Sequence, residues 1–250
     1  MIHYHGLPIT PNTAAICAIG GGHAFVCFAH PEQLGVALDV CQSFAVDNGA
    51  FIAWRKGKPI EDWELYYQWV AEVHRYPQFD FAVIPDVIDG DEEANDALID
   101  QWPWKDSKPH VGAPVWHMHE SLDRLDRLSK WPRICIGSSG EYDKVGSDRW
   151  YARMLEVMGV ICNREGLPCC KIHGLRMLNP DVFTRFPFSS ADSTNIGRNI
   201  GLDVRWKGTY TPASKEARAQ VIRERIEINQ SPTFFDEAAI ADKLPWRGLV

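Results

Sequence analysis

Hydrophobic positions along the chain form short runs that alternate with longer amphipathic stretches. The short runs are rich in β-branched and aromatic residues, and they predict eight strands: Ile2–His5, Ala24–Ala29, Ser43–Asp47, Phe81–Asp86, Ala113–His117, Arg133–Gly137, Cys170–His173 and Phe188–Asp192. Apolar residues at helical spacing predict the intervening helices: Pro11–Ile19, Pro31–Cys41, Glu61–Tyr76, Asp91–Gln101, Ser121–Ser129, Ser147–Asn163, Pro180–Arg185 and Ser214–Asn229. Each strand is thus followed by a helix.

This alternation predicts an α/β fold with a parallel sheet, because consecutive parallel strands need helical crossover connections. Eight such units close naturally into a (β/α)8 TIM barrel, and a doubly wound open sheet is the alternative. The glycines of "IGGGHAF" precede a strand, so the G-x-G-x-x-G dinucleotide fingerprint is absent from the first strand–helix turn. We expect residues 1–250 to form one barrel domain, with 201–250 as a helical C-terminal extension.

Composition adds exclusions to this picture. The chain has 250 residues, of which 45% are hydrophobic, and no apolar run is long enough for a transmembrane helix. The N-terminus lacks the basic start and apolar core of a signal peptide, so a cytoplasmic protein without membrane partners is expected. A net charge of −7 argues against a surface with positive charge spread over it for binding nucleic acid, although residues 204–227 are locally basic. Seven cysteines without a C-x-x-C pair do not predict a zinc site.

The chemistry-bearing residues gather where the predicted strands end. These strand-end residues are His5, Asp47, Asp86, Asp89, His117, His119, Gly137, Ser138, Ser139, His173 and Asp192. In a parallel barrel all strand carboxyl ends lie on one face, where active sites form. Turn formation and helix capping are the alternative explanation, which applies best to Asp89 and Asp91 and worst to Asp47 and Asp192.

Three carboxylates facing one pocket are compatible with two chemistries. One is a metal site completed by His117, His119 or His173, as in a metal-dependent hydrolase. The other is metal-free glycosyl transfer, in which one carboxylate attacks a sugar carbon and a second handles the proton of the leaving group. A further carboxylate can accept the N1–H and N2–H bonds of a guanine-type base.

The ordered motifs resemble those of tRNA-guanine transglycosylases and of their phage and bacterial relatives that insert 7-deazaguanines into DNA. The residues 47–51, "DNGAF", look like the family's D-S-G-G-F-Q. Likewise "IGSS" at 136–139 looks like I-G-G-L, and "DSTNIGR" at 192–198 looks like the nucleophile segment of the family. The resemblance covers roughly residues 43–200 in the same order, and it implies a (β/α)8 barrel that exchanges guanine for a 7-deazaguanine through a covalent glycosyl-aspartate.

The resemblance implies a role for each matching residue. Asp192 would be the nucleophile and Asp47 the acid and base, although the two carboxylates could exchange these roles. The implied substrate-binding residues are Asp86, Gly137, Ser138, His117, His119, His173, Phe51, Arg198 and Asn195. No metal or cofactor is implied for the exchange itself. Trp54, Trp116 or Phe51 could stack on the base.

Two departures from the family pattern affect the expected partner. His117 or His119 stands where the family has a base-contacting glutamine, and the zinc-binding cysteine cluster of the tRNA enzymes is missing. The expected partners are therefore a purine or 7-deazapurine base and a nucleic acid, with DNA favoured over tRNA and a free nucleoside or nucleotide as the alternative acceptor. An N-glycosidase or nucleoside hydrolase, a metal-dependent barrel hydrolase and a catalytically inactive binding subunit remain as alternatives. The sequence carries no prediction of oligomeric state.

Overall fold

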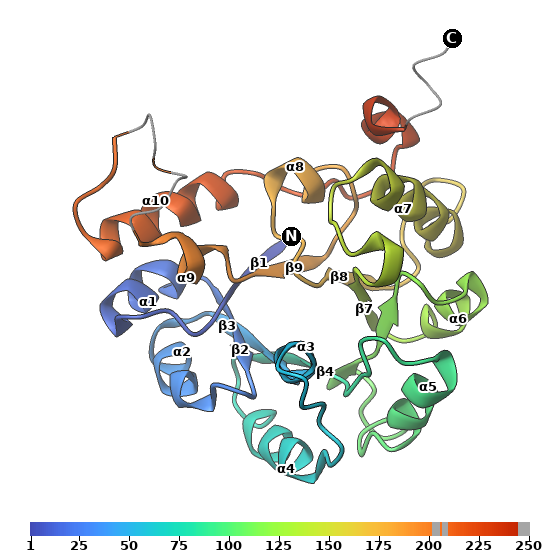
Figure 1. Cartoon of the computed structure of the whole chain (residues 1–250), viewed down its shortest axis with the longest axis horizontal. Helices are drawn as coiled ribbons and strands as arrows, with labels where there is room; N and C mark the ends of the chain where they lie inside the picture. The colour runs from blue at the N-terminus through green and yellow to red at the C-terminus, as the bar shows by residue number, and fades with distance from the viewer. Residues whose placement is uncertain (202–205, 207–209, 245–250) are drawn as a thin grey trace.

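The computed structural model describes residues 1–201, 206 and 210–244, and the sheet is all-parallel (Figure 1). In the spatial order β5-β4-β3-β2-β1-β9-β8-β7-β6, its strands surround a central axis. Their bounds are β1 (Ile2–Gly6), β2 (His23–Cys27), β3 (Ser43–Asp47), β4 (Phe79–Val83), β5 (Gly112–Ala113), β6 (Val115–His117), β7 (Arg133–Gly137), β8 (Lys171–Gly174) and β9 (Ser190–Ser193).

The two ends of this order, β5 and β6, are halves of one strand interrupted at Pro114. Proline has no N–H to donate to the sheet, which separates the halves. The Pro114 carbonyl still accepts a hydrogen bond from the N–H of Cys135 at 2.8 Å. Because β5 pairs with β4 and β6 pairs with β7, the sheet is nearly closed into a barrel. The predicted TIM-barrel fold is confirmed, and the open sheet is not found.

Helices surround the sheet as an outer layer (Figure 1). The main ones are α1 (Asn12–Ile19), α2 (Leu34–Val40), α4 (Glu64–Val73), α5 (Glu92–Asp100), α6 (Leu122–Leu128), α7 (Asp148–Ile161), α8 (Pro180–Phe183) and α10 (Lys215–Glu227), each at a position where the sequence predicts a helix. Within 201–250, α10 packs against α1 of the barrel, and parts of this predicted extension (202–205, 207–209 and 245–250) lie outside the described residues. No helix of the described part of the chain is long and apolar enough to cross a membrane.

The short helices escaped the sequence analysis. They are α3 (Ala50–Arg55) and α9 (Asn195–Asn199), with the 3-10 turns η2 (Gly140–Tyr142) and η4 (Glu237–Lys243); the 3-10 turn η1 (Pro31–Gln33) is the start of the helix predicted over Pro31–Cys41. Helix α3 starts immediately after Gly49, whose φ of 82° reverses the chain at the end of β3. One and a half turns are too short to display a hydrophobic period, so the pattern predicts no helix there. The predicted strand ending at Asp86 also ends earlier, at Val83, shortly before Pro85.

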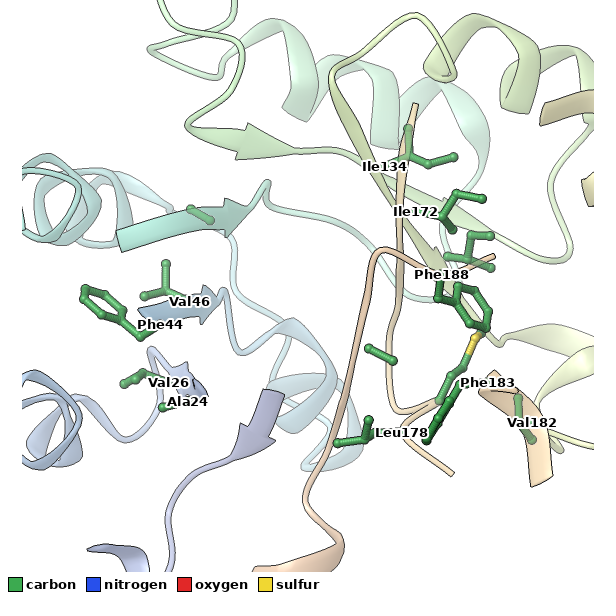
Figure 2. Close-up of a cluster of buried hydrophobic side chains, with 14 of the residues drawn as sticks. Ala24, Val26, Phe44, Val46, Ile134, Ile172, Leu178, Val182, Phe183 and Phe188 are labelled. Carbon is green, nitrogen blue, oxygen red and sulfur yellow. The ribbon is translucent and has the colours of Figure 1, made fainter. Parts of the chain in front are cut away.

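Alternation along each strand separates two cores. Side chains on one face, such as Phe44 and Val46 of β3, pack outward beneath the helices (Figure 2). The opposite face fills the barrel interior with a second cluster: Tyr4, Phe25, Ala45, Phe81, Val83, Ala113, Val115 and Cys135. Because successive residues point to opposite faces, Asp47 shares the inner face with Ala45, two residues earlier. On the inner face, apolar side chains fill the barrel, and polar side chains follow them at the carboxyl ends of the strands.

Candidate functional site

A cavity of about 550 Å³ lies at the carboxyl ends of the strands, above the apolar filling of the barrel. Asp47, Asp86 and Asp192 all line it, together with His117 of β6. This volume is in the range of small-molecule sites. Three acids that are far apart in the sequence thus share one cavity.

Four other predicted site residues line the same cavity: Phe51, Gly137, Ser138 and Arg198. Phe51 comes from α3, and Gly137 ends β7. A Cβ on Gly137 would lie 3.1 Å from Nδ1 of His117, tighter than ordinary van der Waals contact. The strand end therefore passes close to the imidazole only because this residue has no side chain.

Asp47 is half-buried at the end of β3 and has a strongly perturbed pKa. Burial raises the pKa of the Asp47 carboxyl to about 7, opposed by a hydrogen bond from the Cys27 thiol and increased by the charges of Asp192 and Asp86. Its remaining exposed surface faces the cavity. Burial also raises the pKa of Cys27, so that the thiol stays protonated and can donate. Asp47 can therefore take up and release a proton near neutral pH.

The Asp47→Asn variant should gain stability relative to the wild type as the pH rises. Between pH 4 and 7, the unfolded chain has released the Asp47 proton while the folded protein still holds it, so this carboxyl lowers stability as the pH rises toward 7. We expect the variant to be more stable by about 2 to 4 kcal/mol at pH 8, and by little at pH 4. Thermal and urea unfolding at both pH values measure the difference.

The matched control is Asp39→Asn, an exposed aspartate on α2 outside the cavity. Its effect on stability should differ less between the two pH values than the effect of Asp47→Asn. Equal stabilisation of Asp47→Asn at pH 4 and pH 8 would contradict the raised pKa.

Asp86 is held by a buried amide and lies beside a buried imidazole. Nδ2 of Asn48 donates to Asp86 Oδ1 at 2.7 Å and to the carbonyl of Ile84 at 2.9 Å. Oδ1 of Asn48 accepts the N–H of Ala50, at the start of α3. On the other side, His117 Nε2 lies 2.9 Å from Asp86 Oδ2, at an angle unsuited to a hydrogen bond. Asn48 thus fixes Asp86 and α3 relative to each other, a function that the sequence analysis missed.

Asp192 receives a main-chain hydrogen bond. The N–H of Arg176 donates to its Oδ1 at 2.8 Å. His173 Nε2 lies 3.3 Å from the same oxygen, and its Nδ1 lies 2.9 Å from the hydroxyl of Ser190. Burial lowers the pKa of His173, so the imidazole is neutral at pH 7. His173 is fully buried behind Asp192 and does not line the cavity.

His119 and Asn195 are also placed away from the cavity. His119 has its Nδ1 2.7 Å from the Ser139 hydroxyl and its Nε2 3.2 Å from the Gly90 carbonyl. Asn195 starts α9, where its side chain accepts a hydrogen bond from the amide of Asn199. The structure therefore brings neither residue to the cavity where the sequence analysis expected it.

The predicted histidine pair does not converge on one point. The rings of His117 and His119 stack with centroids 5.7 Å apart, and their nitrogens face different partners. Among the residues that the structure describes, no group of three His, Cys, Asp or Glu side chains is arranged as a metal site. Of the candidate stacking residues, Trp116 is fully buried and Trp54 is partly exposed beside Phe51, with ring centroids 5.7 Å apart.

Several cations line the mouth of the cavity, and most of them were missed. Arg55 and Lys56 come from the end of α3, Arg176 from the loop after β8, and Arg198 from α9. Partial desolvation lowers the pKa of the Arg176 guanidinium; the charge of Asp192 opposes this shift, and the positive charges of Arg198 and Arg55 add to it. The sequence feature that could have indicated the two cations at α3 is the dipeptide Arg55-Lys56, which directly follows the apolar residues of this helix. The cavity thus combines an acidic interior with a basic rim.

A buried ionic network joins the loop that carries Asp86 to the end of β6, which carries His117. Glu120 accepts the N–H of His117 at 2.8 Å, a guanidinium N–H of Arg124 at 2.6 Å and the Asn95 amide at 3.1 Å. Asn95 in turn accepts the N–H of Val87, next to Asp86, at 2.8 Å. Glu120 and Arg124 are both almost fully buried. The network therefore sets the separation of two cavity walls.

Comparison of the chain with protein-family models, with curated proteins and with solved structures gives no match. The class that the fold and the cavity define is a barrel with a polar site at its strand carboxyl ends. The function is argued below from the geometry of that site.

Proposed function

We propose that this protein is a glycosyltransferase that exchanges guanine for a 7-deazaguanine base in a nucleic acid, through a covalent glycosyl-aspartate. The observation that carries the proposal is the convergence of Asp47, Asp86 and Asp192 in one cavity, with Asp47 titrating near neutral pH. Glycosyl transfer by this route needs one nucleophilic carboxylate and a separate group that moves a proton. The cavity offers both, and a third carboxylate for the base.

In the proposed reaction Asp192 attacks C1′ of the sugar. The C1′–N9 bond breaks, its electron pair stays on the departing guanine, and Asp47 supplies the proton that neutralises that base. The incoming base then returns a proton to Asp47 and attacks C1′, which releases Asp192. A pKa of about 7 suits Asp47 to both transfers, because neither protonation state is costly at neutral pH. The N–H of Arg176 holds the Asp192 carboxylate for the attack.

Base recognition is assigned to Asp86 and the end of β7. Each carboxylate oxygen of Asp86 can accept more than one hydrogen bond, so the N1–H and N2–H edge of a guanine can bind alongside Asn48. Gly137 and Ser138 line the same cavity, and we assign binding of the base carbonyl to this strand end. Phe51 offers an aromatic face within the cavity.

The polymer is assigned to the basic rim. Arg55, Lys56 and Arg198 surround the mouth of a cavity in a chain whose net charge is −7, so the positive charge is local. Positively charged side chains bind the phosphates of a nucleic acid backbone. A target base inside a duplex must be flipped out of the helix to reach a pocket. The missing cysteine cluster of the tRNA enzymes favours DNA as the acceptor.

Incubation with radiolabelled guanine tests the proposal, with single-stranded DNA, duplex DNA and tRNA as separate acceptors. We expect label to enter DNA and to be chased by unlabelled 7-deazaguanine. Release of free base without incorporation would instead indicate a hydrolase with the same acids. Loss of activity on chelation would favour the metal-dependent alternative. Absence of exchange on every acceptor, with no base bound in soaked crystals, would overturn the proposal.

A further inference from the structure

Arg176 has an unusual backbone conformation at the cavity wall. Its φ is 60°, and within the described part of the chain it is the one non-glycine residue with positive φ. This region is disfavoured for residues with a Cβ and persists where surrounding contacts hold it. Such a residue between β8 and α8, beside the acids, therefore requires an explanation.

The contacts of Arg176 reach three other parts of the site. Its N–H donates to Asp192 Oδ1 at 2.8 Å. Its guanidinium carbon lies 3.9 Å from the centroid of the Phe51 ring, on α3. One guanidinium N–H also donates to the carbonyl of Ser138, after β7, at 3.3 Å. The left-handed backbone thus turns the N–H toward Asp192 while the side chain extends across the cavity wall.

We infer that Arg176 is a positioning residue with two separable functions, an inference that rests on the proposed function. Its main-chain N–H fixes the rotamer of the Asp192 carboxylate. Its guanidinium, held over Phe51 and against Ser138, forms a wall of the cavity against which a planar base packs. The side-chain contacts also offset the unfavourable backbone conformation. They therefore help to keep the main-chain N–H directed at Asp192.

Glycine and alanine substitutions separate these functions. Both remove the guanidinium. Glycine adopts positive φ readily, so Arg176→Gly keeps the backbone turn and the hydrogen bond to Asp192. Alanine retains the penalty of a Cβ but loses the contacts to Phe51 and Ser138, so in Arg176→Ala the backbone relaxes and the N–H turns away from Asp192.

The test combines crystal structures, steady-state kinetics of base exchange and single-turnover kinetics of adduct formation for wild type, Arg176→Gly, Arg176→Ala and Arg176→Lys. In Arg176→Gly we expect KM for the base to rise about tenfold while the rate of adduct formation stays within about twofold. In Arg176→Ala that rate should also fall, by about tenfold. Arg176→Lys should recover part of the affinity, because it restores the charge but not the planar group.

The structures decide the backbone function independently of turnover. Asp192 should remain hydrogen-bonded to residue 176 in the glycine variant and rotate away in the alanine variant. If both variants keep that hydrogen bond, or if their adduct rates are equal, the positioning function is overturned. If KM is unchanged in Arg176→Gly, the cavity-wall function is overturned. If the wild type exchanges no base, the proposed function fails, while the variant structures still show what holds Asp192.

Discussion

Asp192→Asn should form no covalent adduct and should lower base exchange by about 10³-fold or more, because a carboxamide is a poor nucleophile. Asparagine has nearly the same shape as aspartate, and its carbonyl can still accept the Arg176 N–H that binds Asp192 Oδ1 at 2.8 Å. The geometry of the cavity should therefore survive the substitution. Denaturing gel electrophoresis of enzyme trapped on DNA measures the adduct, and labelled guanine incorporation measures exchange.

Two controls separate the chemistry from a general effect of charge. Asp143→Asn removes an exposed carboxylate after η2, outside the cavity, and should exchange base at the wild-type rate. Asp47→Asn should lower turnover for a different reason, because it removes the proton-transferring group. A trapped adduct that persists in Asp192→Asn but disappears in Asp47→Asn would assign the nucleophile to Asp47. Wild-type exchange by Asp192→Asn would eliminate the covalent mechanism.

Arg124→Met should destabilise the fold by about 3 to 5 kcal/mol, since it leaves the buried Glu120 carboxylate without its cation. The pair is almost fully buried, with an N–O distance of 2.6 Å, and Arg124 also donates to the carbonyl of Val115 at 2.9 Å. Glu120 simultaneously receives the N–H of His117. We therefore expect the loss in stability to be accompanied by weaker base binding. Urea unfolding and ligand titration at one pH measure the two effects.

The double variant Glu120→Gln, Arg124→Met should recover much of that stability, because no unpaired charge is then buried. Lys130→Met is the matched exposed control. Lys130 and Asp126 form an ion pair at 2.8 Å with both side chains largely exposed, and its loss should hardly change the midpoint of unfolding. Equal effects of Arg124→Met and Lys130→Met would show that the buried network does not stabilise the protein.

The barrel was predictable because period-2 alternation and strand–helix order are local signals. β3 and β7 match their predicted bounds, Ser43–Asp47 and Arg133–Gly137. The convergence of Asp47 and Asp192 follows from the same signals, since parallel strands end at one face and both side chains share the inner face. Their chemical roles stay predictions.

What escaped the sequence analysis depends on loop geometry. The contacts of Arg176 depend on its left-handed backbone conformation, which no pattern of residues in the sequence predicts. His119 lies in the predicted strand-end motif, but it turns toward Ser139 and Gly90 because β6 ends at His117. His173 lies on the inner face of β8, as alternation predicts, but one level below the cavity. A difference of one residue in strand end or in level along the barrel therefore decides whether a side chain lines the cavity.

The cavity floor consists of side chains that also fill the barrel. Phe25 and Val83 belong to the inner apolar cluster and line the cavity as well. The depth available to a bulky substituent on the bound molecule is therefore limited by the residues whose packing stabilises the fold. A larger substituent could be accommodated by smaller floor side chains, which would lower the stability of the fold, or by loops that widen the cavity. Diversification of ligand size in proteins with this arrangement should accordingly appear in the loops before it appears in the floor.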